Sequence, residues 1–189
     1  TDDYQFGVSP NDFLVDKAAD LPVGKTLCLA DGEGRNGVYL AKLGHQVTGI
    51  DLSSKGQEKA RKLAGEENVQ LELIEADLVE YDLGEASWDC IVSIFFHLPS
   101  KIRRQVHAKV ARALKPGAVL ILEAYTPRQL EFGTGGPPIK DALMTLDSLE
   151  ADFPDLQFEY AIEKEREVIE GNLHSGHASV VQLFVRKPL

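Results

Sequence analysis

A glycine-rich stretch near the N-terminus has the composition of a ligand-binding loop. Residues 27–36 read Leu-Cys-Leu-Ala-Asp-Gly-Glu-Gly-Arg-Asn, and Gly32, Gly34 and Gly37 fit the spacing Gly-x-Gly-x-x-Gly. Glycines at the carboxyl end of a strand let the backbone approach a ligand, and the free N–H groups of the following helix attract its polar atoms. The spacing is typical of sites for adenosine-containing cofactors, but a tight turn without a ligand would give the same pattern.

Two carboxylates further along the chain are candidates for holding an adenosine. Asp51 follows the predicted second strand, where a carboxylate can accept hydrogen bonds from both ribose hydroxyls. Asp77 follows the predicted third strand, where it can accept from the adenine amino group while Ala76 and Leu78 flank the ring. Each has a simpler alternative. Asp51 can cap the next helix, although Ser53 suits that role better, and Asp77 can be a solvated turn residue.

Histidines and an arginine near the predicted strand ends are candidates for the chemical step. His97 follows the fourth strand, and His174 lies between the last two strands. A histidine there can remove a proton from a nucleophile, whereas packing or helix capping is the alternative for His97. Arg35 begins the helix after the glycine loop, where it can attract an anion or pair with a neighbouring carboxylate. His174 and His177 have His-x-x-His spacing, but without a clear third or fourth ligand we expect no metal site.

These residues need a framework that brings their strand ends together. The sequence alternates short apolar runs with amphipathic segments, which predicts right-handed βαβ units. The last two runs have no helix between them and predict an antiparallel hairpin. The expected fold is therefore α/β, with a doubly wound, mostly parallel seven-stranded sheet that ends in this hairpin. Predicted strands cover 26–30, 46–50, 69–75, 88–96, 118–124, 157–169 and 178–186, predicted helices cover 11–20, 38–43, 54–66, 100–114 and 143–153, and predicted connections cover 126–138 and 170–177.

Length and composition predict a single domain, residues 1–189, with 43% hydrophobic and 26% charged residues. The net charge of -10 disfavours phosphate backbones, so we expect no nucleic-acid partner. No apolar run is long enough to cross a bilayer, and the N-terminus has no signal-peptide pattern, so we expect no membrane association. Cys28 and Cys90 lie in apolar runs and are expected to be reduced core residues, which fits a cytoplasmic location.

Taken together, these features resemble the class I S-adenosylmethionine-dependent methyltransferases over nearly the whole chain. The resemblance is carried by the glycine loop, the predicted hairpin, the segment 88–93, the Leu-Lys-Pro-Gly turn at 114–117, Asp51 and Asp77. Within that class, Gly-Arg-Asn at 34–36 followed by Val-Tyr-Leu-Ala at 38–41 is similar to the tellurite-resistance branch, close to thiopurine methyltransferases. Members of that branch methylate small, soft or anionic acceptors.

The resemblance implies a Rossmann-like methyltransferase fold, with S-adenosylmethionine as cofactor and S-adenosylhomocysteine as product. The family has a further glycine where this chain has Ala30, and an acidic residue where it has Cys28. Either Asp31 or Glu33 is therefore expected to contact the methionine ammonium. The residues expected to bind the cofactor are Ala30, Asp31, Gly32, Glu33, Gly34, Asn36, Asp51, Leu52, Ala76, Asp77, Leu78, Ser93 and Ile94.

The resemblance also implies an in-line methyl transfer, which depends mainly on positioning and needs a base only if the acceptor carries a proton. We expect a small-molecule acceptor with a sulfur, selenium, tellurium, halide, oxygen or nitrogen nucleophile, and no protein partner. His97, Arg35 and His174 are expected on the acceptor side. N-terminal segments often fold over the cofactor in this family, so Tyr4 and Phe6 either do so or are frayed.

Three other functions are compatible with parts of the sequence. A nicotinamide oxidoreductase would share the glycine spacing, but the chain lacks the length for a second nucleotide-binding half plus a substrate domain. An interaction domain without activity would explain the departures from the family at Ala30 and Cys28. Methylation of a macromolecule is disfavoured by the acidic charge and by the lack of an added recognition domain.

Overall fold

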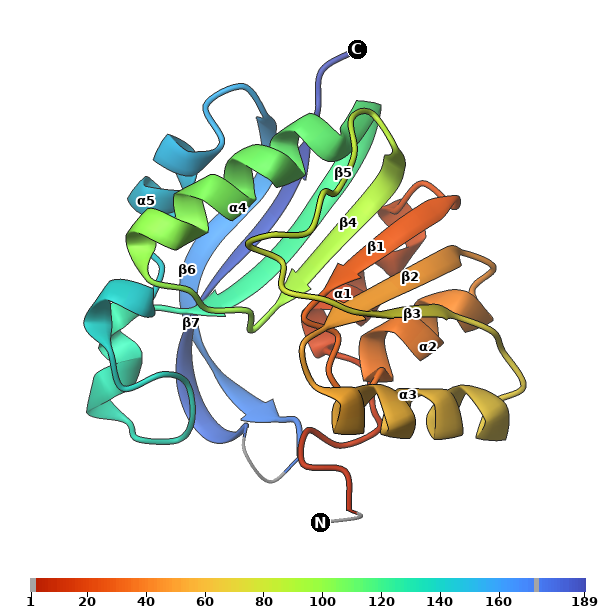
Figure 1. The fold of residues 1–189 in the computed structure, drawn as a ribbon. Helices are drawn as coiled ribbons and strands as arrows, with labels where there is room; N and C mark the ends of the chain where they lie inside the picture. Colours follow the sequence, from red (N-terminus) through yellow and green to blue (C-terminus); the bar gives the residue numbers. More distant parts are fainter. Residues whose placement is uncertain (1–2, 172–173) are drawn as a thin grey trace.

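A computed structural model of the protein describes residues 3–171 and 174–189 and consists of one sheet with helices on both faces (Figure 1). The strands are β1 (Lys25–Leu29), β2 (Gln46–Asp51), β3 (Glu72–Glu75), β4 (Trp88–Ile94), β5 (Leu114–Tyr125), β6 (Gln157–Ile169) and β7 (Ser175–Arg186). The α-helices are α1 (Asp12–Lys17), α2 (Arg35–Lys42), α3 (Ser54–Glu66), α4 (Ser100–Ala113) and α5 (Leu146–Asp152), and short 3-10 helices cover Ala18–Asp20, Pro127–Glu131 and Lys140–Ala142.

The seven strands follow the order β3-β2-β1-β4-β5-β7-β6. Neighbouring strands from β1 to β5 pair in parallel, whereas β7 pairs antiparallel with both β5 and β6. From the centre of the sheet the chain proceeds in opposite directions, from β1 to β2 and β3 on one side and from β4 to β5 on the other. The carboxyl ends of β1 and β4 therefore border the same crevice. The predicted doubly wound, mostly parallel sheet with a terminal hairpin is confirmed.

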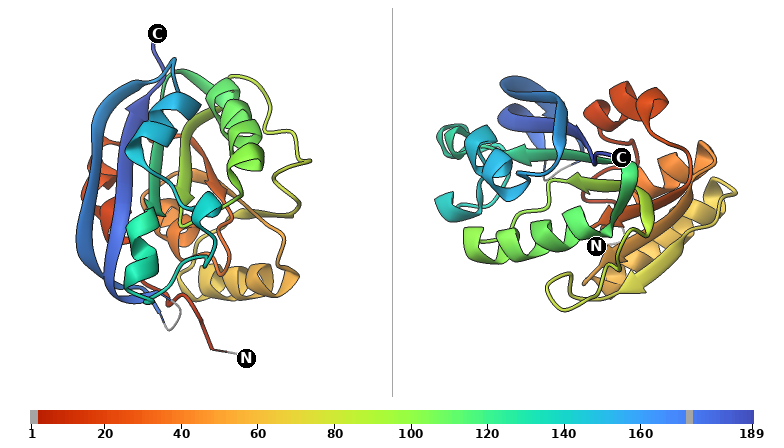
Figure 2. Two further views of the ribbon diagram at one scale, coloured as in Figure 1. Left: turned by 90° about the vertical axis from the view of Figure 1, so that its left-hand side faces the viewer. Right: turned by 90° about the horizontal axis from the view of Figure 1, so that it is seen from above.

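Alternating side chains of the central strands explain the two helical layers. Leu27 and Ile91 are buried with Val106 of α4 on one face of the sheet. Cys28 and Val92, one residue further along each strand, are buried with side chains of α1 and α2 on the other face. Figure 2 shows α1 and α4 on opposite sides of the sheet. Strands that are covered on both faces are expected to be almost continuously apolar, and β1 and β4 are.

The middle of the sheet differs from the prediction at two strand ends. β4 ends at Ile94 rather than at residue 96, because Phe95 adopts a left-handed conformation with φ of 52° and turns the chain. β5 begins at Leu114 rather than at residue 118, because Leu114 pairs with Trp88 across a shift in register. Gly117, with φ of 78°, lies in the irregular part that we predicted as a turn.

Other boundaries also shift, and both α2 and β7 begin three residues earlier than predicted, at Arg35 and Ser175. β3 covers only the second half of the predicted strand 69–75, because Val69 still donates to the carbonyl of Ala64 at the end of α3. The predicted loop 126–138 contains the 3-10 helix Pro127–Glu131, and α5 is shorter than the predicted helix 143–153. None of these shifts changes which strand ends face each other.

Four residues lie outside the described part of the chain, namely Thr1 and Asp2 and, in the predicted connection 170–177, Asn172 and Leu173. Among the described residues, no helix combines the length and the apolar character that a membrane span requires. Both cysteines are buried and unpaired, as expected of reduced core residues.

Candidate active site

Two neighbouring cavities lie at the carboxyl ends of the parallel strands, with volumes of about 470 Å³ and 180 Å³. Ala30 and Asp51 border both cavities, so the two adjoin at this point. The larger cavity is also lined by Gln5, Phe6, Asp31, Gly32, Glu33, Arg35, Asn36, Ser53, Lys55, Gly56, Lys59, Ile94, Phe95 and His174. The smaller cavity is also lined by Leu52, Ala76, Asp77, Leu78, Val79, Phe96 and Leu98.

The loop between β1 and α2 bends sharply beside the larger cavity. Ala30, Gly32 and Gly34 all have positive φ angles, of 49°, 57° and 86°. Gly34 cannot take a side chain, because a Cβ atom there would lie 2.6 Å from the Cβ atom of Ala60 in α3. Ala30 differs from the two glycines, because a left-handed backbone conformation is unfavourable for a residue with a side chain. The bend therefore depends on both glycines and on one strained alanine.

Asp51 lies where the glycine loop and the two cavities meet. Its Oδ2 atom accepts from the N–H of Gly32 at 2.9 Å, and its Oδ1 atom accepts from the N–H of Ser53 at 2.7 Å. The side chain of Ser53 caps α3 by accepting from the N–H of Gly56, so Asp51 is not needed as a cap. A carboxylate has about four acceptor positions, and the two that remain are available to a ligand.

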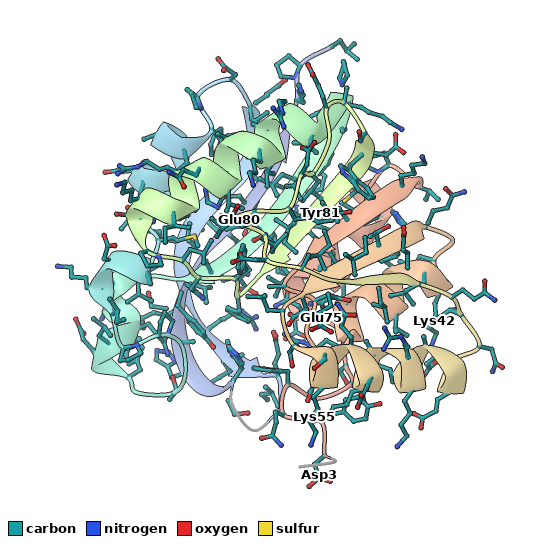
Figure 3. All side chains as sticks on the ribbon, viewed as in Figure 1. Asp3, Lys42, Lys55, Glu75, Glu80 and Tyr81 are labelled. Carbon is teal, nitrogen blue, oxygen red and sulfur yellow. The ribbon has the colours of Figure 1, made fainter. Side chains whose placement is uncertain are left out.

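The smaller cavity contains the other carboxylate predicted to hold the adenosine. The Oδ1 atom of Asp77 accepts from the N–H of Val79 at 2.8 Å, which fixes the turn that follows β3. Ala76 and Leu78 lie on either side of Asp77 in sequence and line the same cavity. In Figure 3, Glu75 marks the end of β3 just before this turn, and Tyr81 follows it. The turn thus presents apolar side chains and one carboxylate to a small cavity.

The two acidic residues of the glycine loop are differently placed. The Asp31 carboxyl group is turned towards α2, where its Oδ1 atom accepts from the N–H of Gly37 at 3.2 Å. Glu33 is buried beside the larger cavity, and its two oxygens contact the Lys59 ammonium at 2.6 Å and the N–H of Phe6 at 3.1 Å. Both carboxyl groups therefore already have protein contacts.

The segment before α1 crosses the larger cavity rather than fraying. The hydroxyl of Tyr4 donates to the carbonyl of Lys59 at 3.2 Å, and Phe6 lines the cavity. Gly7 packs against Gly171 of the hairpin, where a Cβ atom on Gly7 would approach the backbone to 3.3 Å. Asp3 and Lys55 mark the outer edge of the molecule on this side in Figure 3.

Arg35 belongs to a buried ion-pair network rather than offering a free positive charge. It pairs with Glu170 at 2.5 Å, and both side chains are almost fully buried. Arg166 bridges Glu170 at 2.9 Å and Glu123 at 2.8 Å. Asn11 donates to both glutamates. Two arginines thus balance two glutamates, so of the two roles we considered for Arg35 the structure favours pairing with a carboxylate.

His97 lies outside both cavities, which corrects its predicted place on the acceptor side. Its Nε2 atom accepts from the N–H of Tyr125 at 2.9 Å, and its Nδ1 atom contacts the carbonyl of Phe95 at 3.1 Å. Because Nε2 accepts, Nδ1 carries the proton and donates. Burial lowers the pKa of His97 to about 4. With both nitrogens bonded to backbone, His97 braces the turn after β4 and has no free nitrogen for an acceptor.

His174, in contrast, lines the larger cavity. Its Nδ1 atom lies 2.7 Å from the hydroxyl of the fully buried Tyr125. Its ring stacks on Phe95 at 4.9 Å between centroids and lies 5.2 Å from the ring of Phe6. Burial and, to a smaller extent, the charge of Arg35 lower the pKa of His174 to about 4, although Glu170 acts in the opposite direction, so the ring is neutral near pH 7.

Of the remaining residues predicted for the site, some line the larger cavity and others lie outside it. Ile94 lines the larger cavity, whereas Ser93 is buried inside the sheet between β1 and β5 and lies outside both cavities. Asn36 lines the larger cavity, and its Oδ1 atom accepts from the N–H of Asn11 at 2.9 Å. His177 is exposed and pairs with two glutamates of β6. In the described ranges, no three His, Cys, Asp or Glu side chains are grouped to hold a metal ion.

The sequence analysis did not identify several residues of the site. Phe95 directly follows the predicted contact Ile94, and a bulky residue at a strand end beside a ligand loop was a usable signal. Lys59 and Glu170 gave no such signal, because a single charge in a polar helix or hairpin is usually solvated. Only the fold shows that Lys59 forms an ion pair with Glu33 and that Glu170 forms one with Arg35.

A family comparison decides which class of cofactor site this is. Residues 27–117 match the family described as a methyltransferase domain. Over this segment the chain is similar to methyltransferase domains. The matched segment contains the glycine loop, Asp51 and Asp77. The alternative of a nicotinamide oxidoreductase is therefore not supported.

Known proteins agree with this methyltransferase domain. An uncharacterized methyltransferase of Bacillus subtilis is 28% identical over 119 residues, which are 61% of this chain and 49% of that protein. The chain spans less than half the length of the curated relatives it matches. A methyltransferase structure from Methanosarcina mazei has a TM-score of 0.74 at 20% identity, covering 96% of this chain and 99% of that one. TehB from Haemophilus influenzae has a TM-score of 0.76 at 21% identity, covering 94% and 62%. At these identities the two structures show the shared Rossmann-like fold alone.

Proposed function

We propose that this protein transfers a methyl group from S-adenosylmethionine to a small-molecule acceptor. The observation that carries the proposal is Asp51, whose carboxylate lies between the glycine loop and the two adjoining cavities. In this assignment Asp51 would hold the ribose hydroxyls. Ala76 and Leu78 would flank the adenine in the smaller cavity, with Asp77 near its amino group.

Details of the loop support this placement of the cofactor. Gly32 lines the larger cavity beside Asp51, and its φ of 57° together with the hydrogen bond from its N–H to the Asp51 carboxylate fixes the loop at this position. The methionine part would then extend along the larger cavity, past Asn36 and Ile94. We assign the ammonium to the side of Glu33, because the Asp31 carboxyl group is turned away towards α2.

The far wall of the larger cavity supports a small acceptor. Phe6, Phe95 and His174 form an aromatic wall there, and the segment before α1 crosses the opening. Arg35 is engaged by Glu170, which favours an uncharged acceptor over an anion such as tellurite or halide. A soft sulfur nucleophile satisfies both conditions and agrees with the resemblance to the branch that contains thiopurine methyltransferases.

Bound S-adenosylmethionine supplies an electrophilic methyl group on a sulfonium. The residues of the chain then have three tasks. The glycine loop and Asp51 fix the position of the donor, and the aromatic wall with the N-terminal segment excludes water from the reacting groups. His174, neutral near pH 7, would accept a proton at Nε2 from a protonated acceptor while its Nδ1 proton is donated to the hydroxyl of Tyr125.

Calorimetric titration with S-adenosylhomocysteine tests the cofactor assignment. We expect micromolar binding to the wild-type protein and at least about tenfold weaker binding to Asp51→Ala, because hydrogen bonds to a charged group contribute about 1.5–3 kcal/mol. Asp82→Ala, at an exposed position where the carboxylate contacts Arg112 and the N–H of Gly84, should bind like the wild type. No binding to the wild-type protein would contradict the proposal.

A turnover screen tests the acceptor. Formation of S-adenosylhomocysteine would be measured with uncharged thiols, tellurite and iodide at equal concentration. We expect activity with at least one thiol, and we expect His174→Gln to lower kcat about 10²-fold or more at pH 7 for a protonated acceptor. Cofactor binding without turnover of any small acceptor would contradict the small-molecule part of the proposal.

A further inference from the structure

The carboxyl group of Asp31 occupies a space behind the glycine loop that two glycines leave open. A Cβ atom on Gly37 of α2 would lie 2.4 Å from its Oδ2 atom, and one on Gly49 of β2 would lie 3.2 Å from it. The Oδ1 atom accepts from the N–H of Gly37. The carboxyl group is thus enclosed between α2 and β2, while the loop to which it belongs borders the larger cavity.

One oxygen of this buried group lacks a partner. Oδ2 has no hydrogen bond to any residue that the structure describes. The pKa of Asp31 is raised to about 7, mainly by burial and to a smaller extent by the charge of Asp51. The N–H of Gly37 and the charge of Arg35 act in the opposite direction. Facing it from β1 is Cys28, whose thiol pKa is raised by burial, so the thiol stays neutral. If Asp31 only braced the loop, an amide side chain would serve as well, since one oxygen is enough to accept from Gly37. A second buried oxygen without a hydrogen bond is energetically unfavourable.

We infer that Asp31 is a specificity-determining residue, which makes the site favour the charged methyl donor over the demethylated product. The inference rests on the proposed cofactor position in the larger cavity. S-adenosylmethionine and S-adenosylhomocysteine share their adenosine and amino-acid groups and differ in the positive charge on sulfur. An ionised Asp31 places a negative charge behind the loop, and charges interact more strongly in a poorly solvated interior than in water. The attraction acts on the donor alone and therefore favours exchange of product for donor.

The sign of the pH dependence follows from this attraction. A bound cation stabilises the ionised form of Asp31 and lowers its pKa, so donor binding releases a proton near neutral pH. Donor affinity should then rise between pH 6 and pH 8, whereas product affinity should stay nearly constant. Because one pKa unit corresponds to a tenfold change, the ratio of product Kd to donor Kd should rise by about three- to tenfold.

Titration calorimetry with both ligands at pH 6, 7 and 8 tests the inference. The proteins are the wild type, Asp31→Asn and the control Asp82→Asn, whose substituted residue is exposed and lines neither cavity. Asparagine keeps the size of the side chain and can accept from Gly37, but it does not titrate. We expect the Kd ratio to rise in the wild type and the control, and to change less than about twofold in Asp31→Asn.

Proton release gives a measurement on the wild type alone, which serves if Asp31→Asn fails to fold. Titrations at pH 7 in two buffers of different ionisation enthalpy should show proton release with the donor and little with the product. A constant Kd ratio in the wild type, equal proton release with both ligands, or an undiminished rise in Asp31→Asn would each overturn the inference. Absence of binding by both ligands would instead overturn the cofactor assignment on which it rests.

Discussion

Ala30 illustrates how one residue shapes the site through its backbone. It directly follows β1, borders both cavities and packs against the core through its methyl group. Its φ of 49° places it in the left-handed region, which costs a residue with a side chain about 1–2 kcal/mol. The alanine therefore keeps an apolar atom at the junction of the cavities in a backbone conformation that glycine adopts more easily.

We predict that Ala30→Gly raises the free energy of unfolding by up to about 1 kcal/mol. Relief of the left-handed strain should exceed the greater entropy that glycine gives to the unfolded chain. Urea unfolding measures the change. Ala108→Gly, at an exposed position inside α4, should instead lower the free energy of unfolding by about 1 kcal/mol. A loss of stability of similar size in both variants would show that Ala30 is not strained.

The half-buried His97, with both ring nitrogens bonded to backbone, predicts that the stability of the protein depends on pH. Its pKa is about 4 in the folded protein and near 6.5 when unfolded, so the unfolded state binds a proton more readily. This contribution to stability is present above pH 6.5 and is lost as the pH falls towards 4. The difference in free energy of unfolding between pH 7 and pH 4.5 should therefore be smaller in His97→Gln than in the wild type.

His177 provides the matched control for that measurement. It is exposed, and hydrogen bonds to Glu165 and Glu167 raise its pKa, which gives a contribution of the opposite sign, lost as the pH rises. His177→Gln should not reduce the difference between pH 7 and pH 4.5. An equal difference in His97→Gln and the wild type would argue against a His97 that stays neutral in the folded protein.

Residues of the cofactor site were easier to predict than residues beyond it. The glycines and Asp51 stand directly after apolar runs, so their place at a strand end can be predicted from local patterns. The position of His97 could not be predicted in this way. It depends on the left-handed turn at Phe95 and on the N–H of Tyr125, which belongs to a different strand.

At the scale of elements, a buried ion-pair network joins parts of the chain that are distant in sequence. Glu170 at the end of β6 contacts Arg35 of α2, Arg166 of β6 and Asn11 before α1. Glu123 of β5 completes the network. The network ties the hairpin and the N-terminal segment to the helix that follows the glycine loop. Elements that line the larger cavity are therefore joined by buried ion pairs.

We predict that Glu170→Ala lowers the free energy of unfolding by about 3–5 kcal/mol, because it leaves Arg35 buried without its partner. Glu67→Ala removes a partner from the exposed pair with Lys42 and should cost less than about 1 kcal/mol. Urea unfolding of both variants gives the comparison. A cost for Glu170→Ala as small as that for Glu67→Ala would mean that the network does not join these elements.

At the scale of the whole molecule, the alternation of strands and helices was sufficient to predict the sheet. The spatial order at its edge was not predicted, since β7 inserts between β5 and β6. Burial gives the physical reason. β7 is buried continuously over residues 178–185, with apolar side chains at most of these positions, whereas β6 carries charges such as Glu163 and Glu165 and suits an edge.

A crystal structure of the protein with bound S-adenosylhomocysteine tests the central claim most directly. We predict that the ribose hydroxyls contact the Asp51 carboxylate, that the adenine lies between Ala76 and Leu78, and that the sulfur faces His174 across the larger cavity. Binding of the nucleoside elsewhere, for example in the cavity of about 710 Å³ between α4, α5 and the C-terminus, would contradict the account.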